Sequence, residues 1–211
     1  MSRWAHTVTP LPDRILGQMP RVWKDAVDLH RREVRGAIVA ATAALIERHG
    51  LLAVTMSRIA TETGIARATL YKHFPDVEAI VLEWHGQQVS RHLEQLANAR
   101  DRAHGAAARI RAVLDAYARV VFESAGHQDS ELGAFVHGDD RLARSQEQLR
   151  LMVRSLLLDA VRAGDIRADV DADELAGYCL HALAAARTLR SRAAVSRLVA
   201  VTFDGLRLPS A

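Results

Sequence analysis

The chain has 211 residues, of which 49% are hydrophobic and 5% aromatic, and it contains a single cysteine. This composition suits one compact chain or two small domains, and it excludes an internal disulfide and a zinc site built on cysteines. The formal net charge of +3 is unevenly spread, because residues 1–73 carry eleven Lys and Arg against six Asp and Glu (+5), whereas residues 74–211 balance at −2. The basic first third predicts a polyanionic partner for that third, although a solvated surface with a chance asymmetry would have the same charge pattern.

The hydropathy pattern points to a helical protein outside membranes. No apolar run is long enough to span a bilayer, and the N-terminus lacks the apolar core of a signal peptide, so we expect a cytoplasmic protein with no membrane partner. No stretch alternates β-branched or aromatic residues with polar ones, whereas Ala, Leu and Arg are abundant. The expected fold class is therefore all-α.

The N-terminal part divides into an arm and a helix. Residues 1–20 are expected to form a flexible N-terminal arm, because Pro10, Pro12 and Pro20 interrupt any helix. A helical pattern then runs to Gly50, and glycine is a common residue at the end of a helix. Trp23, Ala26, Val27 and His30 lead into a stronger apolar stripe, which consists of Val34, Ile38, Ala41 and Leu45.

After residue 75 the periodicity predicts a series of further helices, about nine in the whole chain. Asp76 is expected to cap a long helix, and Gly126 and Gly164 are expected to end two later ones. Asp171 and Glu174 have the spacing of a capping box at the start of another helix. The segments expected to be helical are 105–125, 130–137, 140–163, 171–190 and 193–205.

The most informative stretch is residues 55–74, which has the pattern of two short helices joined by a tight turn. Thr55 can cap the first helix, and Gly64 lies where that helix must end and the chain must turn. Leu70 and Phe74 are four residues apart on the second helix and are expected to pack back on Ile59. This is the spacing of a helix-turn-helix, whose second helix enters the DNA major groove.

The polar residues of the second helix then point away from the packed side. Arg67 suits two hydrogen bonds to guanine, and the methyl groups of Ala68 and Thr69 suit contact with thymine. Tyr71 and Lys72 are suited to phosphate contacts. The alternative interpretation is a solvated helix face, and for His73 it is local packing beside Phe74.

These residues resemble the DNA-binding domain of the TetR family of repressors over residues 32–82. The similarity rests on Ile59-Ala60, Gly64-Ile65 and the run Thr69-Leu70-Tyr71-Lys72-His73-Phe74. It implies a three-helix DNA-binding domain at 21–75, followed at 76–211 by a helical bundle for ligand binding and dimerisation. The residues that it implies at DNA are Thr55, Ser57, Arg58, Arg67, Ala68, Thr69, Tyr71, Lys72 and His73.

The chain departs from the family pattern just before the second helix. Relatives often have Ser or Thr where this chain has Ala66. Without a side-chain cap, the start of that helix is expected to be weaker by about 1 kcal/mol. Arg31, Arg32 and Arg35 at the start of the first helix are expected to supply additional positive charge toward DNA.

The resemblance also implies a ligand cavity among large residues of the second domain, with His85, Gln88 or His137 as polar anchors. For each of these residues the alternative is ordinary core packing, and Cys179 is read as a small core residue. We expect no metal site and no cofactor, since no metal-binding run or Gly-rich phosphate loop is present. The expected ligand residues are Trp84, His85, Gln88, Tyr117, Phe122, Phe135, Met152 and Tyr178.

The resemblance therefore implies a homodimeric regulator that binds a near-palindromic double-stranded operator. The last two helices of each copy are expected to form the dimer interface. The resemblance further implies a repressor that a small apolar or aromatic effector releases from its operator. The alternative is a helical small-molecule-binding protein that no longer binds DNA. No constellation of residues supports an enzyme.

Overall fold

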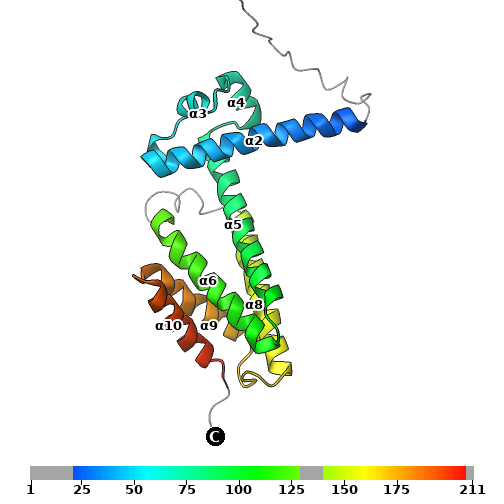
Figure 1. Ribbon diagram of the computed structural model, residues 1–211, viewed down its shortest axis with the longest axis vertical. Coiled ribbons are helices and arrows are strands. Elements are labelled where there is room, and N and C mark those ends of the chain that lie inside the picture. Colours follow the sequence, from blue (N-terminus) through cyan, green and yellow to red (C-terminus); the bar gives the residue numbers. More distant parts are fainter. Residues whose placement is uncertain (1–20, 129–139, 208–211) are drawn as a thin grey trace, which may run out of the picture. The chain divides into compact units, whose positions relative to one another are not determined.

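The computed structural model describes residues 21–128 and 140–207 (Figure 1). Within these ranges every regular element is a helix, as the sequence predicts. The chain separates into two compact units, one ending at Ile80 and the other beginning at Val81. The segment expected to be helical at 130–137 and the arm at 1–20 lie outside the described residues.

The first unit is built on a long helix, α2 (Arg21–His49), which is followed by a short 3₁₀ turn, η1 (Leu51–Ala53). Two short helices, α3 (Met56–Thr63) and α4 (Arg67–His73), come next, and α5 (Val77–Arg102) begins in this unit. In Figure 1, α3 and α4 lie together along one side of the C-terminal half of α2. The core of the unit consists of Ile38, Val39, Leu45, Val54, Met56, Ile59, Leu70, Phe74 and Ile80.

Two apolar residues that lead into the predicted stripe of α2 are exposed. Trp23 is 60% exposed and Val27 is 44% exposed, so neither belongs to the core. Burial on α2 begins only at Ile38 and Val39, because η1 and α3 pack against the later part of the helix.

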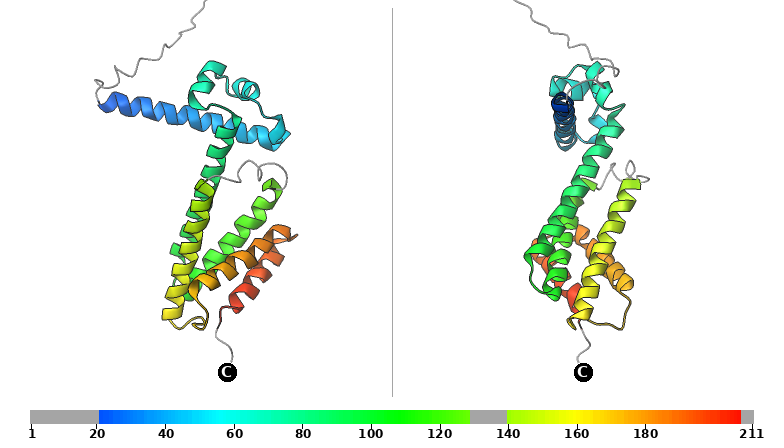
Figure 2. Two further views of the ribbon diagram at one scale, coloured as in Figure 1. Left: turned by 180° about the vertical axis from the view of Figure 1, so that it is seen from behind. Right: turned by 90° about the vertical axis from the view of Figure 1, so that its right-hand side faces the viewer.

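The second unit contains α6 (Ala106–Gln128), α8 (Asp140–Arg162), α9 (Ala172–Ala184), the 3₁₀ turn η2 (Ala185–Thr188) and α10 (Arg192–Asp204). Helix α6 is central, since it packs against α8, α9, η2 and α10, while α9 and α10 lie side by side (Figure 2). Ile110, Leu114, Leu157 and Leu183 are fully buried at the centre of the core. None of the described helices is long and apolar enough to cross a membrane.

The loop between α8 and α9 fixes the far end of this bundle. Gly164 turns the chain with a φ of 74°, and Ile166 is buried. The Asp165 carboxylate accepts a hydrogen bond of 3.1 Å from the amide of Ala107, near the start of α6. The Arg167 amide donates to the carbonyl of Leu206, just after α10. One short loop therefore ties together the start of α6 and the end of α10.

Two predicted helix ends in this unit were wrong. Helix α6 does not end at Gly126 but continues to Gln128, because one glycine costs only about 1 kcal/mol in a helix interior. The segment 171–190 is not one helix: α9 ends at Ala184 and η2 follows as a tighter 3₁₀ turn. That turn buries Ala186 before the chain enters α10.

Two predicted caps are present. The Asp76 carboxylate accepts a hydrogen bond of 2.8 Å from the amide of Ala79, at the start of α5. Asp171 caps α9, where its side chain accepts from the amide of Asp173. Asp173 in turn binds the guanidinium groups of Arg150 and Arg154, which joins α9 to α8.

Candidate nucleic-acid interface

Helix α3 presents one buried and one open side. Thr55 has extended backbone angles, and its hydroxyl accepts a hydrogen bond of 3.2 Å from the amide of Arg58, so it caps the helix as predicted. Met56 and Ile59 are buried, which orients the helix. Ser57 and Arg58 consequently remain exposed on the opposite side.

The turn between α3 and α4 has the conformation that its sequence requires. Gly64 adopts a left-handed conformation with φ 68° and ψ 8°, which favours glycine. The Thr63 hydroxyl donates 2.8 Å to the carbonyl of Ile59 and accepts from the amide of Ile65. These local bonds fix the direction in which α4 leaves the turn.

Helix α4 is anchored by two side chains and is otherwise open. Leu70 is fully buried, and Phe74 directly after the helix is 2% exposed. Residues four apart lie on the same side of a helix, so the remaining sides of this short helix face outward. The exposed residues are Arg67, Ala68, Thr69, Tyr71 and Lys72, which are the residues that the sequence predicts at DNA.

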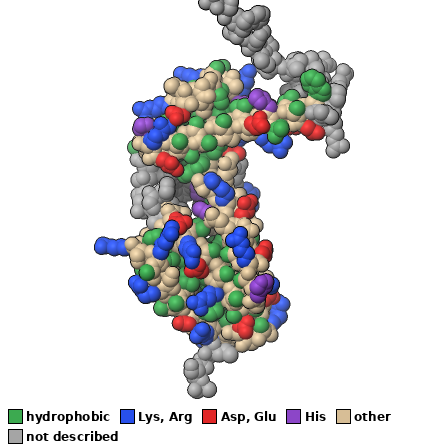
Figure 3. All heavy atoms as spheres, in the orientation of Figure 1, with side chains coloured by type: hydrophobic (Ala, Val, Ile, Leu, Met, Phe, Trp, Pro, Cys, Tyr) green, Lys and Arg blue, Asp and Glu red, His purple; other side chains and the backbone are tan. Residues whose placement is uncertain are grey.

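The exposed face of α4 carries positive charge that the unit does not neutralise. The Arg67 guanidinium lies 6.0 Å from the centroid of the Tyr71 ring. Within residues 21–128 and 140–207, neither Arg67 nor Lys72 forms an ion pair with a carboxylate. Glu62 on α3 is occupied by Arg48 at 2.5 Å. Figure 3 shows Lys and Arg side chains around the α3 and α4 end of this unit.

His73 differs from its neighbours because it is only half-exposed and its backbone is held by Arg35. The Arg35 Nη1 atom donates a hydrogen bond of 2.6 Å to the His73 carbonyl oxygen. Partial burial lowers the pKa of the His73 imidazole below its usual value, and the charges of Arg35, Arg31 and His30 lower it further. The sequence predicts only added positive charge from Arg35, because its contact with the end of α4 depends on how the helices pack.

The start of α4 lacks a side-chain cap, as the sequence predicts. Ala66 occupies the N-cap position with φ −58° and ψ 138°, and no side chain bonds to the first amides of the helix. The first turn of α4 is therefore held mainly by Leu70 and by the backbone hydrogen bonds that the Ala66 carbonyl accepts.

The described ligand residues predicted from the sequence lie on α5, α6, α8 and α9 of the second unit. Trp84, His85 and Gln88 are half-buried on α5. Tyr117, Phe122 and Met152 pack against the core from α6 and α8, and burial raises the pKa of Tyr117. Tyr178 is 44% exposed on α9, while Phe135 and His137 lie outside the described residues. These ligand contacts remain predictions.

Two other features of the second unit bear on its chemistry. Burial raises the pKa of the Cys179 thiol to about 12, which fits the core role predicted for this residue. Across the described part of the chain, no three His, Cys, Asp or Glu side chains come together as a group that would hold a metal ion.

Comparison with known proteins supports the geometry of the first unit. Residues 38–84 match the family model described as bacterial regulatory proteins, tetR family. A curated relative, an uncharacterized HTH-type transcriptional regulator of Mycobacterium bovis, is 30% identical over 162 residues, which cover 76% of this chain and 82% of the relative. The protein belongs to the TetR family. It is a transcriptional regulator with a helix-turn-helix, and not an enzyme.

The second unit and the whole fold have matches as well. Residues 105–208 match the model described as the C-terminal domain of SbtR-like transcriptional regulators. A TetR/AcrR regulator of Thermobifida fusca superposes with a TM-score of 0.70 at 16% identity, covering 83% of this chain and 100% of that one. A TetR regulator of Streptomyces coelicolor superposes with a TM-score of 0.57 at 25% identity, covering 83% and 99%. The fold is therefore that of the family in both units.

Proposed function

We propose that this TetR-family protein is a sequence-specific repressor that acts in the cytoplasm, binds a near-palindromic operator and is released from it by a small apolar or aromatic ligand. The observation that carries the proposal is the face of α4, where Leu70 and Phe74 are buried while Arg67, Thr69 and Lys72 are exposed. A helix presented in this way matches the recognition helix of a helix-turn-helix.

The DNA contacts divide by chemistry. Arg67, Ala68 and Thr69 occupy the first turn of α4, from which recognition helices contact base edges. Tyr71 and Lys72, with Ser57 and Arg58 on α3, are suited to phosphates. Thr55 and His73 complete the proposed contact set from the start of α3 and the end of α4.

The proposed dimer forms through α9 and α10 of two copies. The outward face of these helices includes Tyr178, 44% exposed, and Val201, 67% exposed. Exposed large apolar residues on adjacent helices suit a four-helix interface between two copies. Val201→Arg is expected to shift the protein toward a monomer in analytical ultracentrifugation, whereas Ser196→Arg at another exposed position of α10 serves as the matched control.

Ligand control is proposed to act through α5, the helix that begins in the first unit and continues into the second. A ligand in the helical bundle that binds better to one position of α5 would shift the population toward that conformation. The spacing between the two recognition helices of the dimer would change with it. The ligand contacts proposed from the sequence are Trp84, His85, Gln88, Tyr117, Phe122, Phe135, Met152 and Tyr178.

The test is binding of the full-length protein to DNA from upstream of its own coding sequence, over a salt series. Saturable binding to a short palindrome that weakens steeply with salt is expected, because phosphate contacts release counterions. Lys72→Ala is expected to weaken binding to all sequences and to reduce the slope of log affinity against log salt concentration by about 1. Arg67→Ala is expected to cost about 1–3 kcal/mol of binding free energy on the operator and to relax the sequence preference. Arg119→Ala, on α6 of the second unit, is the matched control for loss of one positive charge.

Two outcomes contradict the proposal. Equal loss of affinity on every sequence for Arg67→Ala would remove its role in reading bases. Weak binding that is identical on all DNA tested, including fragments selected from random sequence, would favour a helical ligand-binding protein that no longer binds specific DNA.

A further inference from the structure

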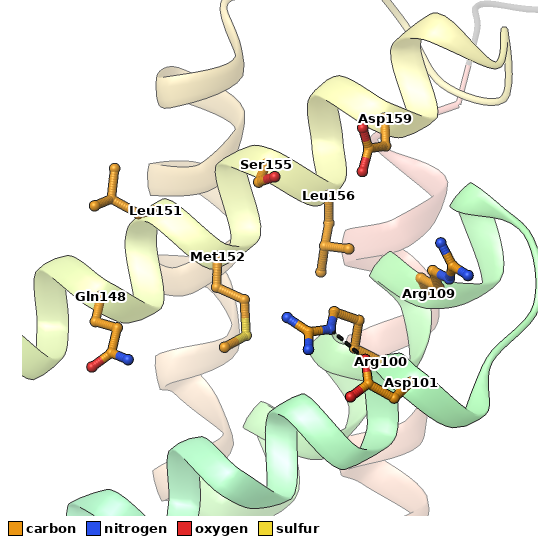
Figure 4. A pocket seen from close by; sticks show the side chains of 9 residues that line it. All are labelled: Arg100, Asp101, Arg109, Gln148, Leu151, Met152, Ser155, Leu156 and Asp159. Atoms are coloured by element: carbon orange, nitrogen blue, oxygen red, sulfur yellow. Dashed lines mark hydrogen bonds and ion pairs between the residues drawn. The ribbon is translucent and has the colours of Figure 1, made fainter.

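The second unit contains an open groove of about 530 Å³, bounded by α8, the last turn of α5 and the first turn of α6 (Figure 4). This volume lies in the range of small-molecule sites. Of the predicted ligand residues that the structure describes, Met152 alone lines it. The groove therefore shares one described residue with the ligand site that the sequence predicts.

One wall of the groove is apolar. Leu151, Met152 and Leu156 lie on α8 and line it, and Figure 4 shows Met152 and Leu156 facing the space between α8 and α5. Leu151 is 49% exposed, whereas Leu156 is nearly buried. A hydrocarbon or ring lying along this wall would cover apolar surface that is now in contact with water.

The opposite side carries two guanidinium groups. Figure 4 shows the Arg100 guanidinium between Met152 and Leu156, near the middle of the groove. Its Nε atom donates to Asp101 at 2.7 Å, and the Nε atom of Arg109 donates to the carbonyl of Ala103 at 3.2 Å. Among the described residues, the terminal nitrogens of both arginines have no hydrogen-bond partner, so they remain able to donate.

The two carboxylates that line the groove, Asp101 and Asp159, are each held by an arginine. Asp101 is close to both arginines, since the hydrogen bond from Arg100 and the charge of Arg109 lower the pKa of its carboxyl. Asp159 pairs with Arg162 at 3.1 Å. Both carboxylates that line the groove therefore already have an arginine partner, and the terminal nitrogens of Arg100 and Arg109 stay available to an anionic ligand.

We propose that this groove binds an amphipathic monoanion, with its carboxylate accepting hydrogen bonds from Arg109 and Arg100 and its apolar part lying along Met152 and its neighbours on α8. A carboxylate matches the paired donors of a guanidinium. One part of the inference rests on the proposed function, namely that a ligand in the groove alters DNA binding. The link is α5, which begins in the first unit and supplies Arg100 to the groove. Binding of the anion itself is independent of DNA.

The experiment is isothermal titration calorimetry of the full-length protein with octanoate and with octylammonium, which share a hydrocarbon chain and differ in charge. Octanoate is expected to bind at least about tenfold more tightly than octylammonium. The double variant Arg100→Gln/Arg109→Gln is expected to lose at least about tenfold in octanoate affinity, since hydrogen bonds to charged groups are the stronger class. Arg119→Gln is the matched control and should bind as the unmodified protein does.

A second variant guards against an effect of misfolding. Leu151→Glu places a negative charge on the exposed edge of the apolar wall, where its side chain needs no buried space. It should weaken octanoate binding and leave the circular dichroism spectrum unchanged. Octanoate affinity that is equal in the unmodified protein and the double variant overturns the site. Equal affinity for octanoate and octylammonium overturns the preference for an anion, and absence of binding by octanoate overturns the proposal as a whole.

The effect on DNA is measured separately. Octanoate at saturating concentration is expected to lower the affinity of the protein for its operator, and the double variant should bind operator normally but fail to respond to octanoate. Failure of the unmodified protein to bind any specific DNA would contradict the proposed function while leaving the calorimetric result intact. Octanoate binding without any effect on operator binding would overturn the regulatory part of this inference.

Discussion

The Arg35 guanidinium joins α2, the first helix of the first unit, to the end of α4. Its Nη1 atom donates to the His73 carbonyl at 2.6 Å, and the group lies 4.0 Å from the centroid of the Phe74 ring. The last carbonyls of a helix have no partner within the helix, and a positive charge is favourable there. Arg35 therefore holds the C-terminal end of α4, whose N-terminal end has no side-chain cap.

Replacing Arg35 by Ala is expected to loosen the whole of α4. The loss of the hydrogen bond and of the contact with the Phe74 ring should cost about 1–2 kcal/mol of local stability. Faster amide hydrogen exchange across residues 67–73 and weaker operator binding should follow. Arg35→Lys should be intermediate, because it keeps the charge but loses the planar face. Arg32→Ala is the control, because the Arg32 guanidinium donates to the carbonyl of Asp28 within α2. Equal exchange rates in Arg35→Ala and Arg32→Ala would refute this role.

At the other end of α4, Ala66→Ser is expected to be stabilising. A serine hydroxyl at this position can accept a hydrogen bond from one of the free amides of the first turn, which contributes about 1 kcal/mol. The prediction is slower amide exchange at residues 67–70 and equal or tighter operator binding. Ala66→Val changes the size of the side chain without supplying an acceptor and should show no such protection. If the serine and valine variants exchange alike, the start of α4 is not limited by its cap.

The sequence was sufficient for features that depend on local chemistry. The left-handed Gly64, the caps Thr55 and Asp76, and the buried pair Leu70 and Phe74 all follow from residue type and spacing, and the structure confirms them. The all-α fold follows in the same way, because no strand pattern competes with the helical one.

Features that depend on packing between distant segments could not be predicted. The contact of Arg35 with His73 joins residues 38 positions apart, and no local pattern indicates it. The groove beside Met152 joins three helices in the same way. The exposed Trp23 shows the converse, since an apolar residue at the right helical spacing is buried only if another element reaches it.

The lowered pKa of His73 gives the first unit a defined pH dependence. Partial burial and the nearby charges of Arg35, Arg31 and His30 hold this pKa below 6.5. As the pH falls below about 6.5, the unfolded chain therefore binds more protons at this residue than the folded one does. The neutral imidazole has no effect on stability above that pH, and below it His73 lowers the free energy of unfolding. We expect amide exchange in residues 34–73 to accelerate between pH 7.5 and 5.5, after correction for intrinsic rates. His73→Gln should reduce this acceleration, whereas His104→Gln, an exposed change in the other unit, should not.

Two glycines of the first unit should respond oppositely to the same substitution. A Cβ at Gly64 or at Gly36 would meet no atom within 4 Å, so steric overlap decides neither case. Gly64 has a φ of 68°, and an alanine there is expected to cost about 1 kcal/mol or more, whereas asparagine should cost less. Gly36 lies in the interior of α2, where alanine is expected to stabilise by about 0.5–1 kcal/mol.

Amide protection of the unit in the full-length chain measures both changes. Because Gly64 also sets the direction of α4, Gly64→Ala should weaken operator binding, while Gly36→Ala should leave it unchanged. A Gly64→Ala variant with unaltered protection and affinity would show that the turn tolerates another conformation.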